Sequence, residues 1–278
     1  LPEWRAMLKI DPMRTMEAAI LAQISSPYLR DIFRRYATYN GSDPRSAPAT
    51  LNCIAWVELG EGGYGVKGGM FEVAKALTNV AERHGAEFRY QARVERITVS
   101  NGQVDGVIVN GDKLECNRVV SNVEPHHLTT TLAPEMSATR APASMSGWTA
   151  VVKAKRQLDR APHQVLFPPN YIQEFEDIFD RDRPPADPTI YVCAQDKAHE
   201  RVGWEGDECL FVMANAPPDT SQRAENAYQG LEEKMMAALI KANVINAQDQ
   251  IIWRRTPSQL ADRFPGSFGS IYGAASNS

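Results

Sequence analysis

The chain has 278 residues, with 30 lysines and arginines against 34 aspartates and glutamates, and its formal net charge at pH 7 is −4. This length is sufficient for one large domain or two ordinary ones, each with a substantial apolar core. The charge is nearly balanced, and the sequence has no basic stripe and no long run of one sign. These features disfavour a nucleic-acid-binding protein and a disordered charged tail.

The four cysteines are widely spaced and form no C-x-x-C pair: they are Cys53, Cys116, Cys193 and Cys209. This pattern favours buried thiols in a reducing cytosol over a metal or redox motif. The sequence has no apolar run of about 18 residues and therefore predicts no transmembrane helix. Because residues 1–5 show neither an initiator methionine nor a signal-peptide pattern, we expect a fragment of a longer protein.

The first quarter of the chain is predicted to be mostly helical. Apolar residues recur at three- and four-residue spacing from Met13 to Ile24, and Pro27 begins a second helix. A loop of turn formers follows at residues 40–44, and then an apolar helical segment at residues 50–57.

The next segment combines an amphipathic helix with a β-hairpin. Apolar residues line one face of a helix over residues 70–84, and Gly85 stands where a C-terminal cap belongs. The Ser100-Asn101-Gly102 turn is a strong hairpin signal. The predicted strands are residues 87–90, 93–99, 104–109 and 118–121. A glycine-rich loop, a helix and strands in this order are half of a nucleotide-binding fold.

After about residue 132 the pattern changes to strands separated by proline-rich loops and two helices. The predicted strands are residues 145–153, 164–167, 189–193, 209–215 and 251–255, and the predicted helices are residues 171–179 and 224–242. Mixed elements of this kind indicate a sheet covered by helices. The expected fold class is therefore α/β of the mixed, α+β type.

Two glycine-rich stretches are candidates for contact with a ligand. Residues 60–65 match G-x-G-x-x-G, but no clean strand precedes them and no acid ends a strand about 20 residues on, so a structural loop is favoured over a phosphate loop. Gly68 and Gly69 either allow the backbone to approach a flat ligand or form a tight turn, and the residues alone leave both open.

The other polar groupings give little support for a catalytic centre. His126 and His127 have no third ligand at metal spacing, so no metal site is expected. No G-x-S-x-G elbow supports a hydrolase triad. The acid-rich segment, Glu174, Glu176, Asp177 and Asp180, is interpreted as a solvated helix face.

Several segments in chain order form a more specific pattern: SSPYLR (25–30), RYATYNGSDP (35–44), APA (47–49), GVKGGM (65–70), RVERI (93–97), VSN (120–122), FPPNY (167–171), DPTIYV (187–192) and GSIYGAASNS (269–278). Together they resemble the bacterial phytoene desaturase family, the flavin-dependent carotenoid desaturases. The later segments are most similar to the subgroup that acts on C30 carotenoids in Gram-positive bacteria.

The resemblance implies an FAD enzyme of amine-oxidase-like architecture. Residues 1–66 are then the helical part of the substrate domain, and residues 132–268 its sheet and helices. Residues 67–131 are an inner segment of the FAD-binding domain, and residues 269–278 begin the return to it. Cofactor contacts are expected at the backbone of Val94, beside the adenine, and at Gly68, Gly69, Ser121 and Asn122. No catalytic residue is indicated.

The implied function is FAD-dependent desaturation or oxidation of a carotenoid polyene, such as phytoene or a C30 diapocarotenoid, in the full-length enzyme. The alternatives are another amine-oxidase-like flavin oxidoreductase and a non-catalytic module that binds an apolar ligand. A polyene needs an apolar tunnel, and residues 1–66 are rich in candidates, although we favour a core role for most of them. These are Trp4, Met7, Met13, Met16, Phe33, Tyr36, Tyr39 and Trp56.

Because carotenoids reside in lipid, the full enzyme is expected to be cytoplasmic and to dock peripherally on the membrane. The expected contact is the pair of N-terminal helices that carry Arg30, Arg34 and Arg35. No nucleic-acid partner is expected, and the sequence does not indicate an oligomeric state.

The chain departs from the family in one respect that generates a prediction. It has neither the initial strand, G-x-G-x-x-G loop and helix nor the final glycine-rich segment that binds the flavin in the family. Without the initial strand, loop and helix, no helix N-terminus is available to bind the pyrophosphate of FAD. We expect the polypeptide alone to bind FAD poorly, as measured by flavin absorbance after purification with excess FAD; a stoichiometrically yellow protein would refute this.

Overall fold

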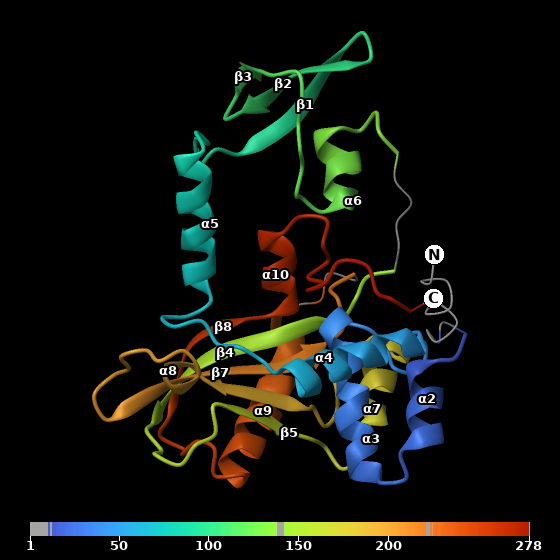
Figure 1. Ribbon diagram of the computed structural model, residues 1–278, viewed down its shortest axis with the longest axis vertical. Helices are drawn as coiled ribbons and strands as arrows, with labels where there is room; N and C mark the ends of the chain where they lie inside the picture. The colour runs from blue at the N-terminus through green and yellow to red at the C-terminus, as the bar shows by residue number, and fades with distance from the viewer. Residues whose placement is uncertain (1–10, 12, 138–141, 221–222, 224, 278) are drawn as a thin grey trace.

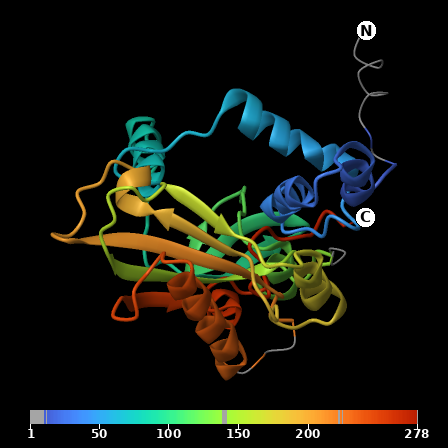
Figure 2. The same ribbon diagram turned by 90° about the horizontal axis from the view of Figure 1, so that it is seen from below.

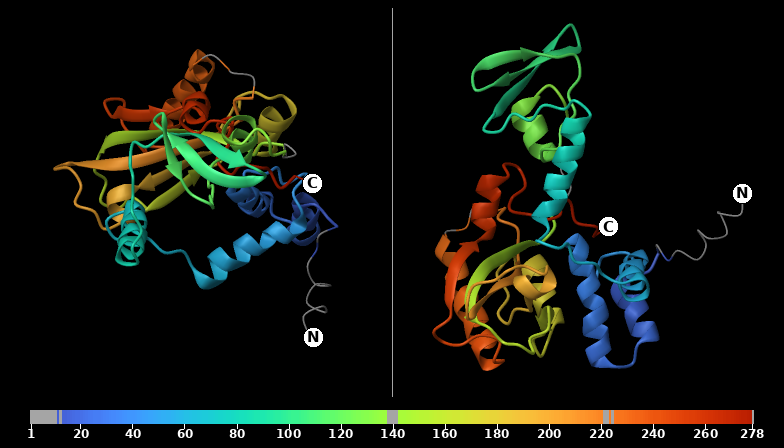
Figure 3. Two further views of the ribbon diagram at one scale, coloured as in Figure 1. Left: turned by 90° about the horizontal axis from the view of Figure 1, so that it is seen from above. Right: turned by 60° about the vertical axis from the view of Figure 1, so that its left-hand side comes forward.

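The computed structural model describes residues 11, 13–137, 142–220, 223 and 225–277. It contains two antiparallel sheets, one of three strands and one of five. Figure 1 shows the small sheet above the large one, with helix α5 (Phe71–Arg83) running between the two levels. The N-terminal helices lie beside the large sheet, away from the small one (Figure 3).

Two capped helices begin the described chain: α2 (Met16–Gln23) and α3 (Pro27–Arg34). The hydroxyl of Thr15 accepts a hydrogen bond from the backbone N–H of Ala18, and Pro27 occupies the first turn of α3. A capping hydroxyl accepts a hydrogen bond from a free N–H group of the first turn, and a proline in that turn has no N–H group to satisfy. Both predicted helices are confirmed.

Three further helical turns complete this layer: η1 (Arg35–Asn40), η2 (Ala49–Asn52) and α4 (Cys53–Glu61). They form a small core with α2, made of Met16, Ile20, Tyr36, Ala37 and Ala55. Two of the three arginines predicted for membrane contact, Arg30 and Arg34, are engaged within the protein. Arg34 is ion-paired with Glu17 and Asp31, and Arg30 donates through Nε to the carbonyl of Ile24 at 2.6 Å.

Helix α5 ends as the sequence predicts. Gly85 has a φ of +85°, and the backbone N–H of Ala86 donates to the carbonyl of Ala81 at 3.0 Å. This left-handed residue closes the helix because glycine has no Cβ to oppose it. The chain then enters the small sheet, formed by β1 (Val94–Ser100), β2 (Gln103–Val109) and β3 (Asp112–Glu115) in that order.

The hairpin prediction is confirmed, two other strand assignments in this region are corrected, and one strand was not predicted. Ser100 pairs with Gln103 across the Asn101-Gly102 turn. Residues 87–90 and 118–121 are not strands; the side chain of Val120, for example, is fully exposed and packs on no partner. Strand β3 was missed, although Asn110 and Gly111 both have positive φ and form a second Asn-Gly turn.

Two short helical turns cover one face of the small sheet: α6 (Pro125–His127) and the π-turn η3 (Leu128–Leu132). Ile97 of β1 packs with Leu132 and Ala133 in a separate small core.

The large sheet has the strand order β5-β6-β7-β4-β8, and every pair is antiparallel. Its strands are β4 (Ser146–Lys155), β5 (His163–Leu166), β6 (Ile190–Ala194), β7 (Asp207–Ala216) and β8 (Gln250–Arg255). All five correspond to predicted strands. The connecting turns are α7 (Ile172–Phe175), η4 (Glu176–Asp180), α8 (Gln195–Ala198) and η5 (Glu225–Tyr228), followed by the helices α9 (Gln229–Lys241) and α10 (Pro257–Arg263).

One face of the large sheet is closed by α9, as seen from below in Figure 2. Leu231, Met235 and Leu239 of this helix pack on the strands in the main core. The strands contribute every second residue, for example Leu210, Val212 and Ala214 of β7. Since successive side chains of a strand point to opposite faces, the intervening residues lie on the other face. That face is not covered by α9.

Candidate functional site

The open face of the large sheet forms the floor of a cavity of about 900 Å³, and the N-terminal helical layer forms one wall. The lining residues come from segments far apart in the sequence. They are Arg35, Thr38, Tyr39, Glu58, Gly63, Tyr64, Gly65, Met70, Pro162, His163, Val165, Tyr171, Thr189, Tyr191, Cys193, Gln195, Lys197, Ala198, His199, Phe211, Met213, Asn215 and Tyr272.

The floor of the cavity is mainly apolar and aromatic. Phe211 and Met213 of β7 lie next to Tyr191 and Cys193 of β6, and Val165 of β5 extends the surface. These are the alternate residues of the same strands that bury Val212 and Val192 under α9. A binding surface of this kind recognises a ligand mainly by apolar contact.

The helical wall is polar and internally hydrogen-bonded. The hydroxyls of Tyr36 and Tyr39 donate to the two carboxylate oxygens of Glu58, at 2.9 and 2.5 Å. Burial, and then the neighbouring Glu58, raise the pKa of Tyr36 to about 12. The same two causes raise the pKa of Tyr39. Both phenols therefore remain neutral donors, and Glu58 accepts from both.

Arg35 adds a cation to this wall. Its Nη1 donates to the hydroxyl of Tyr39 at 3.3 Å, and its Cζ lies 5.3 Å from the ring centre of Tyr39 and 5.9 Å from that of Tyr191. These distances are in the range of cation–π contacts. On the far side, the hydroxyl of Tyr191 lies 2.9 Å from Nδ1 of His163. Burial is the main cause that raises the pKa of Tyr191.

A buried carboxyl group lies directly behind the cavity. Glu174 is 1% exposed, and its Oε1 accepts from Nδ2 of Asn215 at 2.8 Å while Oε2 accepts from the backbone N–H of Thr189 at 2.5 Å. Asn215 and Thr189 both line the cavity. Burial raises the pKa of Glu174 to about 7, against the opposing effect of these two donors.

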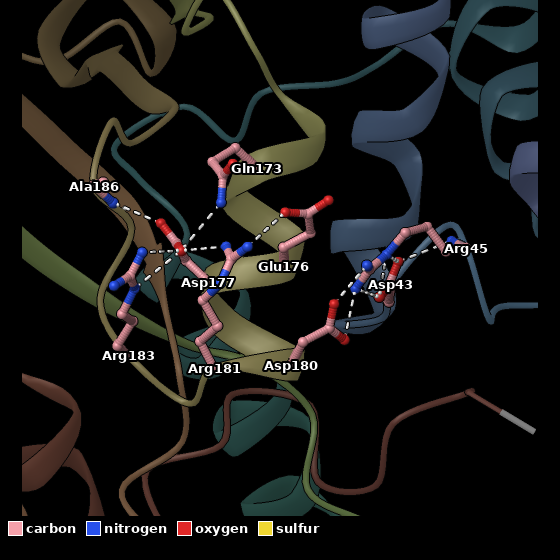
Figure 4. A network of polar contacts seen from close by, with 9 residues as sticks. All are labelled: Asp43, Arg45, Gln173, Glu176, Asp177, Asp180, Arg181, Arg183 and Ala186. Atoms are coloured by element: carbon pink, nitrogen blue, oxygen red, sulfur yellow. Dashed lines mark hydrogen bonds and ion pairs between the residues drawn. The ribbon is translucent and has the colours of Figure 1, made fainter.

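The interpretation of the acid-rich segment as a solvated face is wrong for two of its four members. Asp177 is fully buried, as Glu174 nearly is, whereas the side chains of Glu176 and Asp180 reach solvent. Asp177 accepts from Arg181, Arg183 and the backbone N–H of Ala186 (Figure 4). Arg181 lies at helical spacing from Asp177, whereas Arg183 and Ala186 come from the chain after the turn, which helical spacing alone did not reveal.

The same turn fastens the helical layer to the sheet. The guanidinium of Arg45 bridges Asp43 in the N-terminal segment and Asp180 in η4, at 2.5 and 2.7 Å (Figure 4). This bridge joins two layers that border the cavity. It is partly exposed, so its role is to set position more than to stabilise.

The two glycine-rich stretches have structural explanations. The G-x-G-x-x-G match begins inside helix α4, so the strand–loop–helix context of a phosphate loop is absent over these described residues. At Gly65 a Cβ would lie 2.5 Å from the carbonyl oxygen of Ala198, which shows a close approach to α8. Gly68 and Gly69 both have positive φ in the turn before α5, a conformation that glycine adopts without a Cβ clash.

The predicted cofactor residues do not form one cluster. Gly68 and Gly69 precede α5, whereas Val94 follows its far end at the start of β1, and a helix of 13 residues is about 20 Å long. Ser121 and Asn122 lie in an exposed segment without regular structure. Close to Val94, an open hollow of about 790 Å³ is lined by residues 91–93, Arg263 and Phe264.

The apolar candidates of residues 1–66 divide into four groups. Met16 and Tyr36 are core residues and Phe33 packs against them, as favoured, while Tyr39 lines the cavity. Met13 and Trp56 are exposed, which corrects the expectation of a core role for them. Trp4 and Met7 lie outside the described residues.

The structure also tests the expectations for the cysteines and histidines. Cys193 is buried but Cys53 is exposed, so the expectation of buried thiols is wrong for Cys53. The ring of His126 packs against that of Phe268, and the two ring centres lie 5.3 Å apart. Over the described ranges, no three His, Cys, Asp or Glu side chains are grouped in a way that would hold a metal ion.

Comparison with known proteins identifies related sequences and folds. The model of the family described as flavin containing amine oxidoreductase matches residues 3–242. Hydroxyneurosporene desaturase of Rubrivivax gelatinosus is 34% identical over 98% of this chain and 54% of its own length. The 4,4'-diapolycopene oxygenase of a Methylomonas species is 30% identical over 98% of this chain and 57% of its own length.

A solved oxidoreductase from Methanosarcina mazei has the same fold, with a TM-score of 0.62 at 15% identity over 87% of this chain and 55% of that one. The chain thus spans about half the length of the relatives it matches. These findings confirm the expected mixed fold, the resemblance to carotenoid desaturases and the flavin cofactor of the family.

Glu174 generates a prediction about stability and pH. Its folded-state pKa lies above the ordinary value of 4.5, so its favourable contribution is complete below about pH 4 and is lost as the pH rises through about 7. From this group alone, the free energy of unfolding should fall by about 1–3 kcal/mol between pH 5 and pH 8. Glu174→Gln imitates the protonated form and should remove this fall, as measured by urea unfolding at several pH values.

The matched control is Glu176→Gln, which makes the same change two residues away at a partly exposed carboxyl. The free energy of unfolding of this variant should depend on pH as it does in the unmodified chain. An equally steep fall in Glu174→Gln would contradict the assignment to Glu174.

Proposed function

The chain belongs to the flavin containing amine oxidoreductase family, and on this premise we propose that the complete enzyme is an FAD-dependent carotenoid desaturase or oxidase. The observation that carries the proposal is the cavity of about 900 Å³ with an apolar and aromatic floor on the sheet. Polyenes have large apolar surfaces, and burying such a surface contributes about 25 cal/mol per Å². The named relatives convert carotenoids, which supports the same substrate class.

We propose that the FAD lies along the small sheet and α5. The contacts are those inferred for the sequence: the Val94 backbone, Gly68, Gly69, Ser121 and Asn122. The fit is supported by the hollow beside Val94, where Arg93 and Arg263 provide positive charge for an anionic cofactor. A bulge between Val94 and Arg96 also interrupts the strand ladder at this point, and bulges leave backbone groups unpaired.

The domain assignment is part of the same proposal. Residues 67–131 belong to the FAD-binding domain, residues 1–66 and 132–268 to the substrate domain, and residues 269–278 begin the return. The separation of the two sheets supports this division. The final segment contacts the substrate side, because the side chain of Asn277 accepts from the backbone N–H of Asp43 at 2.9 Å.

When bound, FAD supplies the oxidant for removal of hydrogen from adjacent carbons. The residues of this chain bind and orient the polyene and exclude water from it. Phe211 and Met213 provide the contact surface, and the wall of Tyr39 and Glu58 limits its position. None of the described side chains is assigned the role of acid or base.

Conversion of pigments in cells tests this function. The complete coding sequence should produce more unsaturated or oxidised carotenoids, resolved by liquid chromatography, in cells that supply candidate polyenes. Met213→Trp fills the cavity floor and should lower conversion at least about tenfold, whereas Ile252→Trp on the exposed edge strand β8 should not.

Turnover of an amine instead of a polyene would replace this proposal with another oxidoreductase of the family. Polyene binding without turnover would favour the non-catalytic module.

We also propose peripheral association with a membrane. No helix in the described part of the chain is both long and apolar enough to cross a bilayer. The outer side of α4 is a more suitable contact than the arginines, because Trp56 and Leu59 are 73% and 66% exposed next to the cavity-lining Glu58. Aromatic and leucine side chains on such a surface insert at the lipid interface.

Flotation of the complete enzyme with liposomes measures this association. The double change Trp56→Ser and Leu59→Ser should reduce the floating fraction severalfold. Ile252→Ser, which removes an exposed apolar side chain from β8, should leave it unchanged. A lack of flotation of the unmodified enzyme at low salt would count against membrane docking.

A further inference from the structure

Arg35 is a cation in the cavity wall without an acidic partner. No carboxylate among the described residues lies within 4.0 Å of its guanidinium, although Arg34, its neighbour in sequence, pairs with both Glu17 and Asp31. Glu58, an acid that lines the cavity, accepts from the two tyrosines. Among the described residues, therefore, no carboxylate pairs directly with the charge of Arg35.

Most of the hydrogen-bonding capacity of Arg35 is unused. A guanidinium has five N–H donors, and among the residues that the structure describes Arg35 makes one side-chain hydrogen bond, from Nη1 to the hydroxyl of Tyr39. Lys197, another cation of the cavity, differs because its Nζ donates to the carbonyls of Leu158 and Arg160 at 2.8 and 2.5 Å.

The surrounding rings hold Arg35 in place. Its guanidinium lies near the rings of both Tyr39 and Tyr191, and each of these phenols is itself held, Tyr39 by Glu58 and Tyr191 by His163. A guanidinium restrained by two fixed rings loses little further freedom when it binds a ligand. It is thus preorganised as a donor beside an apolar floor.

A pure hydrocarbon in this cavity would remove water from Arg35 and offer it no acceptor. Burying a charged donor without a partner is costly, whereas an oxygen on the ligand would replace the lost water. The apolar floor and the cationic wall together fit a ligand that is mostly apolar and carries oxygen at one end.

We infer that Arg35 is a specificity-determining residue that binds an oxygen atom at the end of the polyene substrate. The inference rests on the proposed function and names its substrate class: polyenes with an oxygen-bearing end group. Tyr39 and Tyr191 position the guanidinium. The reaction that supplies this substrate is then one that hydrates or oxygenates the polyene end before this enzyme acts on it.

The test compares substrates that differ only at the end group. The complete enzyme is assayed in detergent micelles with a hydrocarbon polyene and with the same polyene carrying a terminal hydroxyl, carbonyl or carboxylate. We expect the unmodified enzyme to prefer an oxygenated substrate by about ten- to hundredfold in kcat/KM, the range of one hydrogen bond to a charged group. The effect should lie mainly in KM, because a hydrogen bond made equally to the bound substrate and to the transition state strengthens binding without raising kcat.

Arg35→Met should abolish the preference, and Arg35→Lys should restore part of it, because lysine keeps the charge but loses the planar donor fork. The matched control is Arg254→Met, on strand β8, which pairs with Glu232 outside the cavity. Circular dichroism verifies the fold of each variant. If Arg35→Met does not fold, Arg35→Lys and the substrate comparison with the unmodified enzyme still decide the question.

Equal conversion of the hydrocarbon and all oxygenated forms by the unmodified enzyme would overturn the inference and leave the proposed function intact. A preference that survives in folded Arg35→Met would also overturn it. Failure to convert any polyene would instead refute the proposed function.

Discussion

The alternation of side chains along β6 and β7 is the constraint on which the site depends. One set of residues, such as Val192 and Val212, is buried under α9, and the other, such as Tyr191 and Phe211, forms the floor of the cavity. Because the period is two, a slip of one residue in register would exchange the two sets. The packing of α9 therefore fixes the cavity floor, and stability and binding are set by opposite faces of the same strands.

A second constraint is the junction that holds the helical wall opposite this floor. Gly41 has a φ of +61°, and a Cβ there would lie 2.6 Å from the Cβ of Ser144. The hydroxyl of Ser144 is 2.7 Å from that of Ser270 and accepts from the backbone N–H of Tyr272. Three distant segments thus meet next to η1, which carries Arg35 and Tyr39. Only glycine allows this approach, so the position of the wall depends on a residue that does not line the cavity.

Local signals in the sequence predicted most of the regular structure. The five strands of the large sheet, the cap at Gly85 and the hairpin at Asn101-Gly102 follow from periodicity and turn chemistry. The same chemistry at Asn110-Gly111 would have revealed β3. The cavity could not be predicted in this way, because Glu58, His163 and Asn215 meet only through tertiary packing. The burial of Glu174 was missed for the same reason: its partners, Thr189 and Asn215, are 15 and 41 residues away.

The charge balance of the wall follows from how its hydrogen bonds are arranged. A carboxylate close to a guanidinium would normally neutralise it, but Glu58 accepts from Tyr36 and Tyr39, whose raised pKa values keep both phenols protonated. The Tyr39 oxygen then accepts from Arg35 while its proton remains directed to Glu58. Glu58 thus acts on Arg35 through a neutral phenol and not by direct pairing. The positive charge of Arg35 remains available on the cavity side, beside a floor that is mainly apolar and aromatic.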